Sequence, residues 1–351
     1  MKNLLVLGKG DTPYTDRNMR RFAGCAEKAG FDVQRADYHE IGNVTDFGGG
    51  RVNVMFFFPF TFWNAYCEVP EDTRLYGTSR LAYERFRGYF LQVKDRLEQR
   101  FGTQQLHYAV PPENAYVDRD KIETIRRLRL HNVPTSEPVG YTSLHDIIGS
   151  VTQERGVFIK CRYGAEGKGI TVLHHDRWVT NYRIEGDRLT NHGVNGLWHF
   201  TDITGREDLL NQLLQHEVIV EREILTTAVC LDPALRGKKF DLRAYVVGQG
   251  VPHMFVRLND ARNEVTNFSQ GATIKHHPNT GLKEDCLRFV RQIAQQAAEA
   301  MGLRFVGVDI MFDGDLNNAK VIETQAFTDF PCITKFDLGA YMISDTSGLF
   351  I

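Results

Sequence analysis

A predicted β-hairpin near the end of the chain constrains the fold more than any other stretch. Residues 305–312 are rich in β-branched and aromatic side chains, which favour a strand. Residues 313–318 supply the Gly, Asp and Asn that are typical of a turn, and residues 319–325 return as a second strand. This order predicts an antiparallel pair.

The predicted hairpin carries three oxygen-bearing side chains that would meet. Residues two apart in a strand share a face, so Glu323 and Gln325 point the same way. Pairing around the turn would bring Asp309 near Glu323. Two carboxylates and an amide oxygen suit Mg²⁺, and carboxylates in strands this apolar would be costly without a cation. On this stretch alone, a hairpin whose acids face solvent or pair with Arg or Lys explains the residues equally well.

Composition limits the remaining classes of protein. The chain has 351 residues, of which 42% are hydrophobic and 25% charged, as expected for two or three globular domains. Its net charge of -2 gives no field that would attract nucleic acid or a membrane, so neither is expected as a partner. The longest apolar run, residues 52–63, is too short to span a bilayer. Six cysteines without a CxxC pair favour reduced thiols in a cytoplasm over disulfides or a zinc site.

The first hundred residues read as a small open α/β domain. Apolar strands alternate with helices, as in parallel sheets. The predicted strands are 2–7, 31–36 and 53–58, and the predicted helices are 17–29 and 81–101. Gly8-Lys9-Gly10 lacks the full GxGxxG spacing, so a tight turn is favoured there over a nucleotide site. The aromatic run 56–63 exceeds what one core strand needs. Core packing is favoured for it over a substrate pocket or a subunit interface.

A glycine-rich loop lies between two predicted strands in the middle of the chain. The strand 157–160 ends on Lys160, and the strand 170–173 follows the loop. The loop holds Gly164, Gly167, Lys168 and Gly169. Such a loop brings backbone N–H groups close to phosphate oxygens. It is not a Walker loop, because Lys168 is followed by glycine. The alternative is a glycine hairpin that binds no ligand. Lys160 at the end of the strand favours phosphate binding over this alternative.

The order of these segments resembles the ATP-grasp superfamily, in particular its branch with glutathione synthetase, the ribosomal-protein glutamate ligase and the tubulin tyrosine ligase-like enzymes. Five features match in sequence order across residues 118–328. The first three are Asp120-Lys121 at the start of a helix that leads to residues 132–134, Ile159-Lys160 followed by the glycine loop, and the strand and hinge 218–224. The fourth is the stretch 239–246, together with a further similarity at residues 266–270. The fifth is Asp309 with Glu323 and Gln325.

The resemblance implies an α/β (α+β) chain with the ATP-grasp fold and an N-terminal open α/β pre-ATP-grasp domain. The expected domains are residues 1–110, a central subdomain with the glycine loop at 111–216, and a C-terminal subdomain with the metal and substrate site at 217–351. It also implies ATP and Mg²⁺ as cofactors. The implied activity is an ATP-dependent carboxylate–amine ligase that forms an amide through an acyl phosphate, with an amino acid or peptide as substrate.

The resemblance further assigns roles to residues. The implied catalytic residues are Arg243 and Arg257; the ATP-binding residues are Lys121, Lys160, Gly164, Gly167, Lys168, Gly169, Glu221, Arg222, Glu223 and Ile224; the substrate residues are Asp241, Arg243, Asn267 and Gly271; the metal ligands are Asp309, Glu323 and Gln325. Two departures stand out. Gln325 replaces the usual Asn, and residues 326–331 replace the usual turn beside the acceptor site.

Two other classes compete with the ligase. A kinase on the same fold would phosphorylate a small polyol and would need a strongly basic acceptor pocket, which the N-terminal domain does not supply. A non-catalytic nucleotide-binding scaffold would not need Lys160, Arg257, Asp309 and Glu323 together. The sequence leaves the oligomeric state open, a homo-oligomer included.

Overall fold

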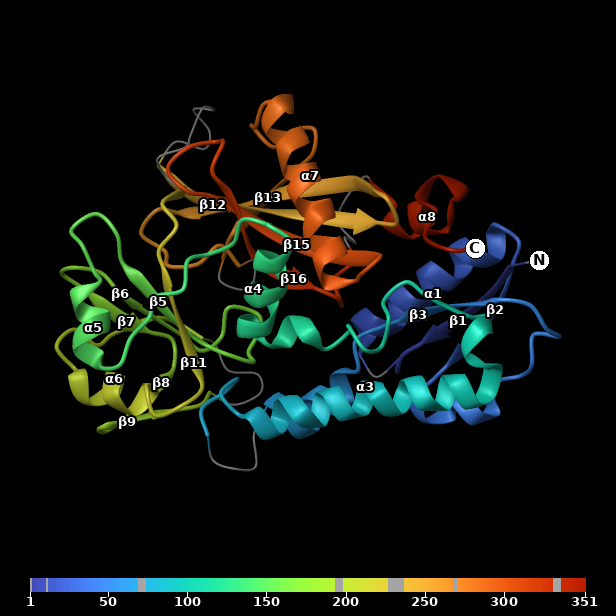
Figure 1. Cartoon of the computed structure of the whole chain (residues 1–351), viewed down its shortest axis with the longest axis horizontal. Coiled ribbons are helices and arrows are strands. Elements are labelled where there is room, and N and C mark those ends of the chain that lie inside the picture. Colours follow the sequence, from blue (N-terminus) through green and yellow to red (C-terminus); the bar gives the residue numbers. More distant parts are fainter. Residues whose placement is uncertain are drawn as a thin grey trace.

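The computed structural model describes residues 2–10, 12–68, 74–192, 198–226, 237–267, 271–330 and 336–351. Figure 1 shows three bodies along the long axis, with the central part of the chain in green, the C-terminal sheet in orange and the N-terminal sheet in blue. Within the described ranges no helix is both long and apolar enough to cross a bilayer. The cysteines described are free thiols at positions 25, 67, 161 and 286.

The N-terminal sheet is parallel throughout, which confirms the predicted open α/β arrangement. Its strand order is β2-β1-β3-β4, with β1 at Lys2–Leu7, β2 at Phe31–Ala36, β3 at Val52–Phe56 and β4 at Leu106–Tyr108. The helices are α1 (Pro13–Lys28), the short α2 (Phe60–Trp63) and α3 (Arg80–Phe101), which runs along the sheet in Figure 1. Helix α1 begins earlier than predicted because Thr12 caps it by accepting the N–H of Thr15 at 3.0 Å, and Pro13 fits the first turn.

The central sheet is antiparallel and carries the glycine loop. Its order is β10-β7-β6-β5-β11, with β5 at Val157–Cys161, β6 at Ile170–Leu173, β7 at Trp178–Thr180, β10 at Thr201–Asp202 and β11 at Val218–Arg222. A small hairpin of β8 (Arg183–Glu185) and β9 (Arg188–Thr190) and the helices α5 (Leu144–Gly149) and α6 (Glu207–Leu213) complete this body. The glycine loop connects the neighbouring strands β5 and β6.

The C-terminal sheet contains the predicted hairpin. Its order is β14-β13-β12-β15-β16, with β12 at Lys238–Val247, β13 at Gly250–Asp260, β14 at Thr273–His276, β15 at Phe305–Phe312 and β16 at Ala319–Gln325. Helix α7 (Glu284–Met301) packs its predicted apolar stripe on this sheet, and α4 (Lys121–Leu130) lies beside α7. Asp309 lies opposite Glu323 as predicted, and the register shifts directly after Asp309.

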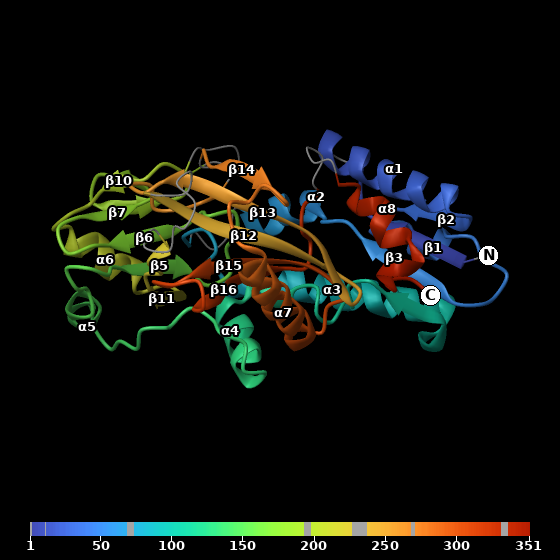
Figure 2. The same ribbon diagram turned by 90° about the horizontal axis from the view of Figure 1, so that it is seen from above.

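The end of the chain returns to the N-terminal sheet. Helix α8 (Leu338–Ile343) lies beside α1, and both termini lie at the same end of the molecule in Figure 2. The side chain of Asn53 donates to the carbonyl of Ile351 at 2.9 Å and accepts its N–H at 3.0 Å. The last part of the predicted range 217–351 therefore packs on the range 1–110. The three domain boundaries themselves stay a prediction.

Candidate active site

A pocket lies between the central and C-terminal sheets and has an apolar end. Phe158 of β5 and Ile170 of β6 face Met311 of β15 and Ile322 of β16 across it. Phe158 and Lys160 share a face of β5, as do Asp309 and Met311 of β15, so each strand offers one apolar and one charged group. A flat apolar ring fits between such walls.

Cationic side chains occupy the other part of this pocket. Lys121, Lys160, Lys168 and Lys239 all line it. The ammonium of Lys160 lies 2.5 Å from the Glu221 carboxylate, and that of Lys121 donates to the carbonyl of Gly164 at 2.5 Å. The free space is about 120 Å³, which is below the roughly 300–1,000 Å³ of ordinary ligand sites. A nucleotide would therefore require the loop to move outward.

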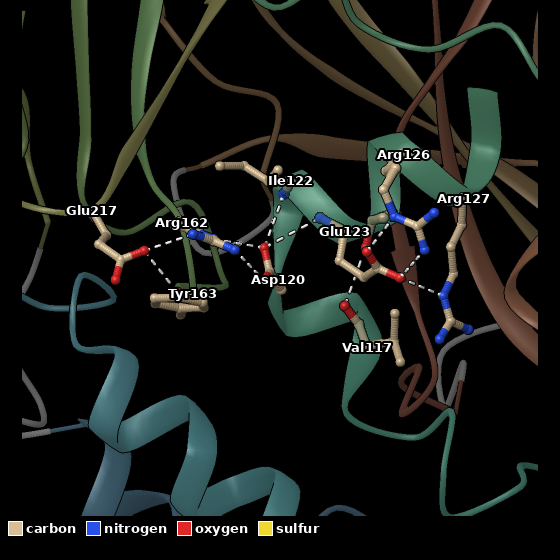
Figure 3. Close-up of polar contacts among 10 residues, drawn as sticks. Val117, Asp120, Ile122, Glu123, Arg126, Arg127, Arg162, Tyr163 and Glu217 are labelled. Carbon is tan, nitrogen blue, oxygen red and sulfur yellow. Dashed lines mark hydrogen bonds and ion pairs between the residues drawn. The ribbon is translucent and has the colours of Figure 1, made fainter. Parts of the chain in front are cut away.

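The start of helix α4 fixes Lys121 at the mouth of the pocket. Figure 3 shows Asp120 between this helix and Arg162. Asp120 caps the helix by accepting the N–H groups of Ile122 at 3.1 Å and Glu123 at 3.3 Å. Arg162 donates two hydrogen bonds to Asp120, at 2.8 and 2.7 Å. Its other side reaches Glu217 at 2.6 Å. The helix start and the glycine loop are thus held as one unit.

The glycine loop is fastened to the N-terminal body. The N–H of Tyr163 donates to the carbonyl of Gly77 at 2.7 Å, and the N–H of Ala165 donates to the hydroxyl of Tyr76 at 3.2 Å. The ammonium of Lys168 lies 2.5 Å from Glu68, and both side chains are largely buried. The loop therefore stands in a closed position over the pocket.

The predicted loop glycines divide into two groups. Gly167 lines the pocket with a φ of +70°, and a β-carbon there would lie 2.8 Å from Asn267, which follows β13 in the chain. Gly164 and Gly169 face away from the pocket. A β-carbon at Gly164 would clash with the sulfur of Cys161, and one at Gly169 would lie 2.7 Å from the hydroxyl of Tyr182. These two glycines allow close packing of the loop.

Two buried aspartates and two buried arginines form one ion-pair network. Arg257 of β13 donates to Asp241 of β12 at 2.7 and 2.5 Å and also lies 2.8 Å from Asp309. Arg243 of β12 holds both oxygens of Asp309, the second at 2.9 Å. Burial opposes ionisation of Asp309, but the charges of Arg243 and Arg257 outweigh it and hold the pKa of Asp309 below its usual range. Burial raises the pKa of Asp241.

The predicted metal ligands fit Mg²⁺ in part. Asp309 and Glu323 lie opposite each other and both line the pocket. The low pKa of Asp309 keeps it an anion that only accepts hydrogen bonds. Gln325 lines the neighbouring cavity instead. In the part of the chain that the structure describes, no group of three His, Cys, Asp or Glu side chains is placed to share a metal. Mg²⁺ is commonly held by one or two carboxylates plus substrate phosphates. Both oxygens of Asp309 are held by Arg243, so Mg²⁺ at Asp309 would require these contacts to be exchanged, whereas Glu323 is only partly buried.

The predicted hinge after β11 reaches the pocket at alternate residues. Arg222 and Ile224 line it. The side chains of Glu221 and Glu223 are buried and do not line it. Glu221 accepts a hydrogen bond from Ser136, and Glu223 accepts one from the N–H of Gly156 at 2.9 Å. These two acids brace the pocket from behind.

The predicted substrate residues are brought together only in part. Asp241 and Asn267 line the pocket, and Arg243 lines the neighbouring cavity. Gly271, with a φ of +87°, has open space around it and lines neither. The predicted motif residues 268–270 lie outside the described residues.

A second, larger cavity of about 720 Å³ lies between the N-terminal sheet and the C-terminal sheet. Its walls combine aromatic rings with charged and polar side chains. Phe58, Phe60, Phe327 and Phe330 line it while only partly buried. The predicted core packing therefore describes the run 56–63 only in part, because its later residues line this cavity.

The two spaces share a boundary. Arg257, Lys168, Asn267 and Ala165 line both of them. A group bound in the small pocket and a group bound in the large cavity would meet at this boundary.

Several lining residues escaped sequence reasoning. Arg119 and Asp329 line the large cavity, and Ser136 and Glu264 line the small pocket. Arg119 lay next to the recognised Asp120-Lys121 pair, and Asp329 lay in the turn that departs from the family pattern. Their neighbourhood in the sequence could therefore have marked Arg119 and Asp329 as site residues. Nothing in the sequence around Ser136 or Glu264 marks them.

Comparison with known proteins identifies the fold. Neither a protein-family model nor a curated protein sequence matches the chain. Solved structures match it over almost its full length. The ATP-grasp ligase PsnB, complexed with a phosphomimetic variant of a minimal precursor, Mg and ADP, is similar over 99% of this chain and 98% of that chain, with a TM-score of 0.59 and 14% identity.

Two further solved structures agree. D-cycloserine synthetase DcsG is similar over 99% of both chains, with a TM-score of 0.57 and 13% identity. The RiPP-associated ATP-grasp ligase of Chryseobacterium gregarium, in complex with ADP and a leader and core peptide, covers 99% of this chain and 97% of that one, with a TM-score of 0.55 and 12% identity. At this identity the likeness shows the fold alone. The chain has the ATP-grasp fold, as the resemblance implied.

Proposed function

We propose that this ATP-grasp chain is an ATP-dependent carboxylate–amine ligase that uses ATP and Mg²⁺. One observation carries the proposal. A pocket with an apolar end and a charged end adjoins a larger cavity, and Arg257 lies in the wall that both share. A nucleotide in the first space and an organic substrate in the second would meet beside this guanidinium.

The small pocket supplies what a nucleoside triphosphate needs. Phe158 and Met311 offer an apolar slot for the base, and Lys121, Lys160 and Lys168 offer charge for the phosphates. Asp309 and Glu323 would hold Mg²⁺, which neutralises phosphate charge when bound.

The reaction we propose has two steps. An oxygen of the donor carboxylate attacks the γ-phosphorus, and ADP leaves. The amine then attacks the acyl carbon, and phosphate leaves with the carboxylate oxygen while the amine loses a proton. Arg257 and Arg243 stabilise the charge on the transferring phosphoryl group. The closed glycine loop keeps water away from the acyl phosphate.

The large cavity favours this ligase over a polyol kinase. A polyol is polar on every side and needs a wall of hydrogen-bonding groups. The walls here hold charged and polar groups but also the partly exposed rings of Phe58, Phe60, Phe327 and Phe330, which a polyol would leave without an apolar contact. The expected substrate is an amino acid or peptide with apolar surface. Two solved neighbours are complexed with a precursor or a peptide: PsnB with a minimal precursor, and the Chryseobacterium gregarium ligase with a leader and core peptide.

A turnover assay tests the proposal. Purified protein is incubated with Mg²⁺ and ATP against pooled amino acids and short peptides, and ADP and free phosphate are both measured. A ligase releases equal ADP and phosphate only when a carboxylate and an amine are present. ADP with a phosphorylated product and no free phosphate would identify a kinase instead.

A further inference from the structure

Arg119 is a cation in the wall of the large cavity. It ends the short 3₁₀ turn η4 (Val117–Arg119), just before helix α4. Its side chain is only 12% exposed. The guanidinium carbon lies 5.1 Å from the ring centroid of Phe58 and 5.1 Å from that of Trp63. All three side chains line the cavity.

One hydrogen-bond donor of Arg119, its Nε–H, is not used within the described residues. Its Nε is buried and has no hydrogen-bond partner there. Asp118 lies 3.7 Å from this nitrogen, which balances charge but is too long for a hydrogen bond. Leaving a buried guanidinium N–H unpaired is costly. The two rings offset part of this cost through cation–π attraction. An anionic ligand in the cavity would satisfy the rest.

The opposite charge stands on another wall of the same cavity. Asp329 is 53% exposed and lies 3.0 Å from Arg243. Phe58, which stacks under Arg119, also contacts Phe327, with centroids 5.5 Å apart. Phe327 is two residues before Asp329 in the chain, so the two charges border one aromatic surface. The other charged residues of the cavity, Arg17, Glu68, Glu166, Lys168, Arg243 and Arg257, have partners of their own. Arg119, Asp329 and these rings would take the carboxylate, the ammonium and the apolar side chain of an amino acid.

We propose that the large cavity binds an α-amino acid, free or at the C-terminus of a short peptide, with a bulky apolar or aromatic side chain, and that Arg119 pairs with its free carboxylate. This substrate is the amine acceptor of the proposed ligase, so the assignment rests on that function. The acceptor ammonium would lie toward Asp329 and the shared boundary at Arg257. The cavity volume of about 720 Å³ lies within the usual range for small-molecule sites.

Direct binding tests this assignment without any turnover. Trp63 lines the cavity and reports binding through its fluorescence, and Trp63→Phe identifies the source of the signal. The ligands are phenylalanine, tyrosine, leucine and the dipeptide alanyl-phenylalanine, each paired with its C-terminal amide. The acids should bind about 10- to 100-fold more tightly than the amides, as expected for a charge-assisted bidentate pair.

Arg119→Gln removes the charge and should abolish the preference for acids over amides. Arg119→Lys keeps the charge but loses the fork, and it should restore only part of the preference. Arg87→Gln is the matched control, because Arg87 also lies over a ring, that of Tyr116, but is not part of either cavity wall. It should leave the preference unchanged.

Turnover then separates the two proposals. In the ligase assay, Arg119→Gln should raise the KM for the acid acceptor at least tenfold and leave the KM for ATP unchanged. The assignment is overturned if no acid binds, if the wild type binds acids and amides within twofold, or if Arg119→Gln weakens both equally, as a structural pair with Asp118 would. Acid binding that depends on Arg119 without ATP turnover would overturn the ligase and the acceptor role, and only the pairing of Arg119 with the carboxylate would stand.

Discussion

Asp309 of β15 lies directly opposite Glu323 of β16 in the antiparallel pair. Their side chains therefore leave the same face of the sheet and line the same pocket. Their surroundings differ. Asp309 is 1% exposed and held by two arginines, whereas Glu323 is only partly buried. The two carboxylates should therefore respond differently to substitution.

Glu323→Gln should remove most of the activity and leave the fold intact. The change removes one negative charge from the expected Mg²⁺ site, which costs roughly 10²–10³ in kcat. Urea unfolding should show a stability change below about 1 kcal/mol, because Glu323 is partly exposed. Asp315→Asn, in the loop of the same hairpin, is the control and should keep wild-type turnover. A Glu323→Gln protein with near wild-type kcat would exclude this metal site.

Asp309→Asn should both inactivate and destabilise the protein. It leaves Arg243 and Arg257 without their shared anion in a buried network. Removing one partner of a buried ion pair costs about 3–5 kcal/mol. Urea unfolding of this variant beside Glu323→Gln measures the difference. Equal stability of the two variants would mean that the network around Asp309 contributes little to folding.

Glu68→Gln should loosen the glycine loop. Glu68 holds Lys168 at 2.5 Å and accepts the indole N–H of Trp63 at 2.8 Å, and Gln keeps only the second interaction in full. Since the closed pocket is small, we expect nucleotide to associate about tenfold faster, which corresponds to ~1.4 kcal/mol. Stopped-flow mixing with a fluorescent nucleotide measures this rate. Glu166→Gln removes the more exposed partner of Lys168 and should have a smaller effect. An unchanged association rate for Glu68→Gln would show that the loop does not limit entry.

His253 should make stability depend on pH between about 4 and 6.5. Burial lowers the pKa of His253 to about 4, with His276 and His277 adding to the effect. The unfolded chain takes up this proton near pH 6.5, so stability falls as pH decreases from 6.5 and the loss is complete below about 4. The loss should reach about 3 kcal/mol.

His253→Phe removes this proton site and retains the stacking on Phe336, whose centroid lies 5.1 Å away. Urea unfolding at pH 7 and pH 4 should show a smaller loss in the variant than in the wild type. His145→Gln, at an exposed position, should behave as the wild type. If His253→Phe loses as much stability as the wild type, the pH dependence arises elsewhere.

Local periodicity made much of the fold predictable. The hairpin register follows from the turn residues after Phe312, and α7 follows from its apolar spacing. The parallel N-terminal sheet follows from apolar strands separated by helices. Each of these signals lies within a few residues of the element it predicts.

The residues that surround the site could not be predicted from local sequence patterns. The partners of Asp309 come from β12 and β13, and which strands neighbour β15 is decided by the tertiary fold. The large cavity forms where α2 of the N-terminal body faces the turn that holds Asp329. The return of residues 338–351 to the N-terminal sheet carries no local sequence signal either.

The most direct test of the ligase is the fate of a carboxylate oxygen. The donor carboxylate is labelled with ¹⁸O, and the phosphate released during turnover with ATP and an amine is analysed by mass spectrometry. An acyl phosphate intermediate transfers one labelled oxygen to each phosphate, so we expect phosphate that carries a single ¹⁸O. Phosphate without label, released at the same rate, would contradict the proposed function, because the carboxylate would then never have bonded to phosphorus.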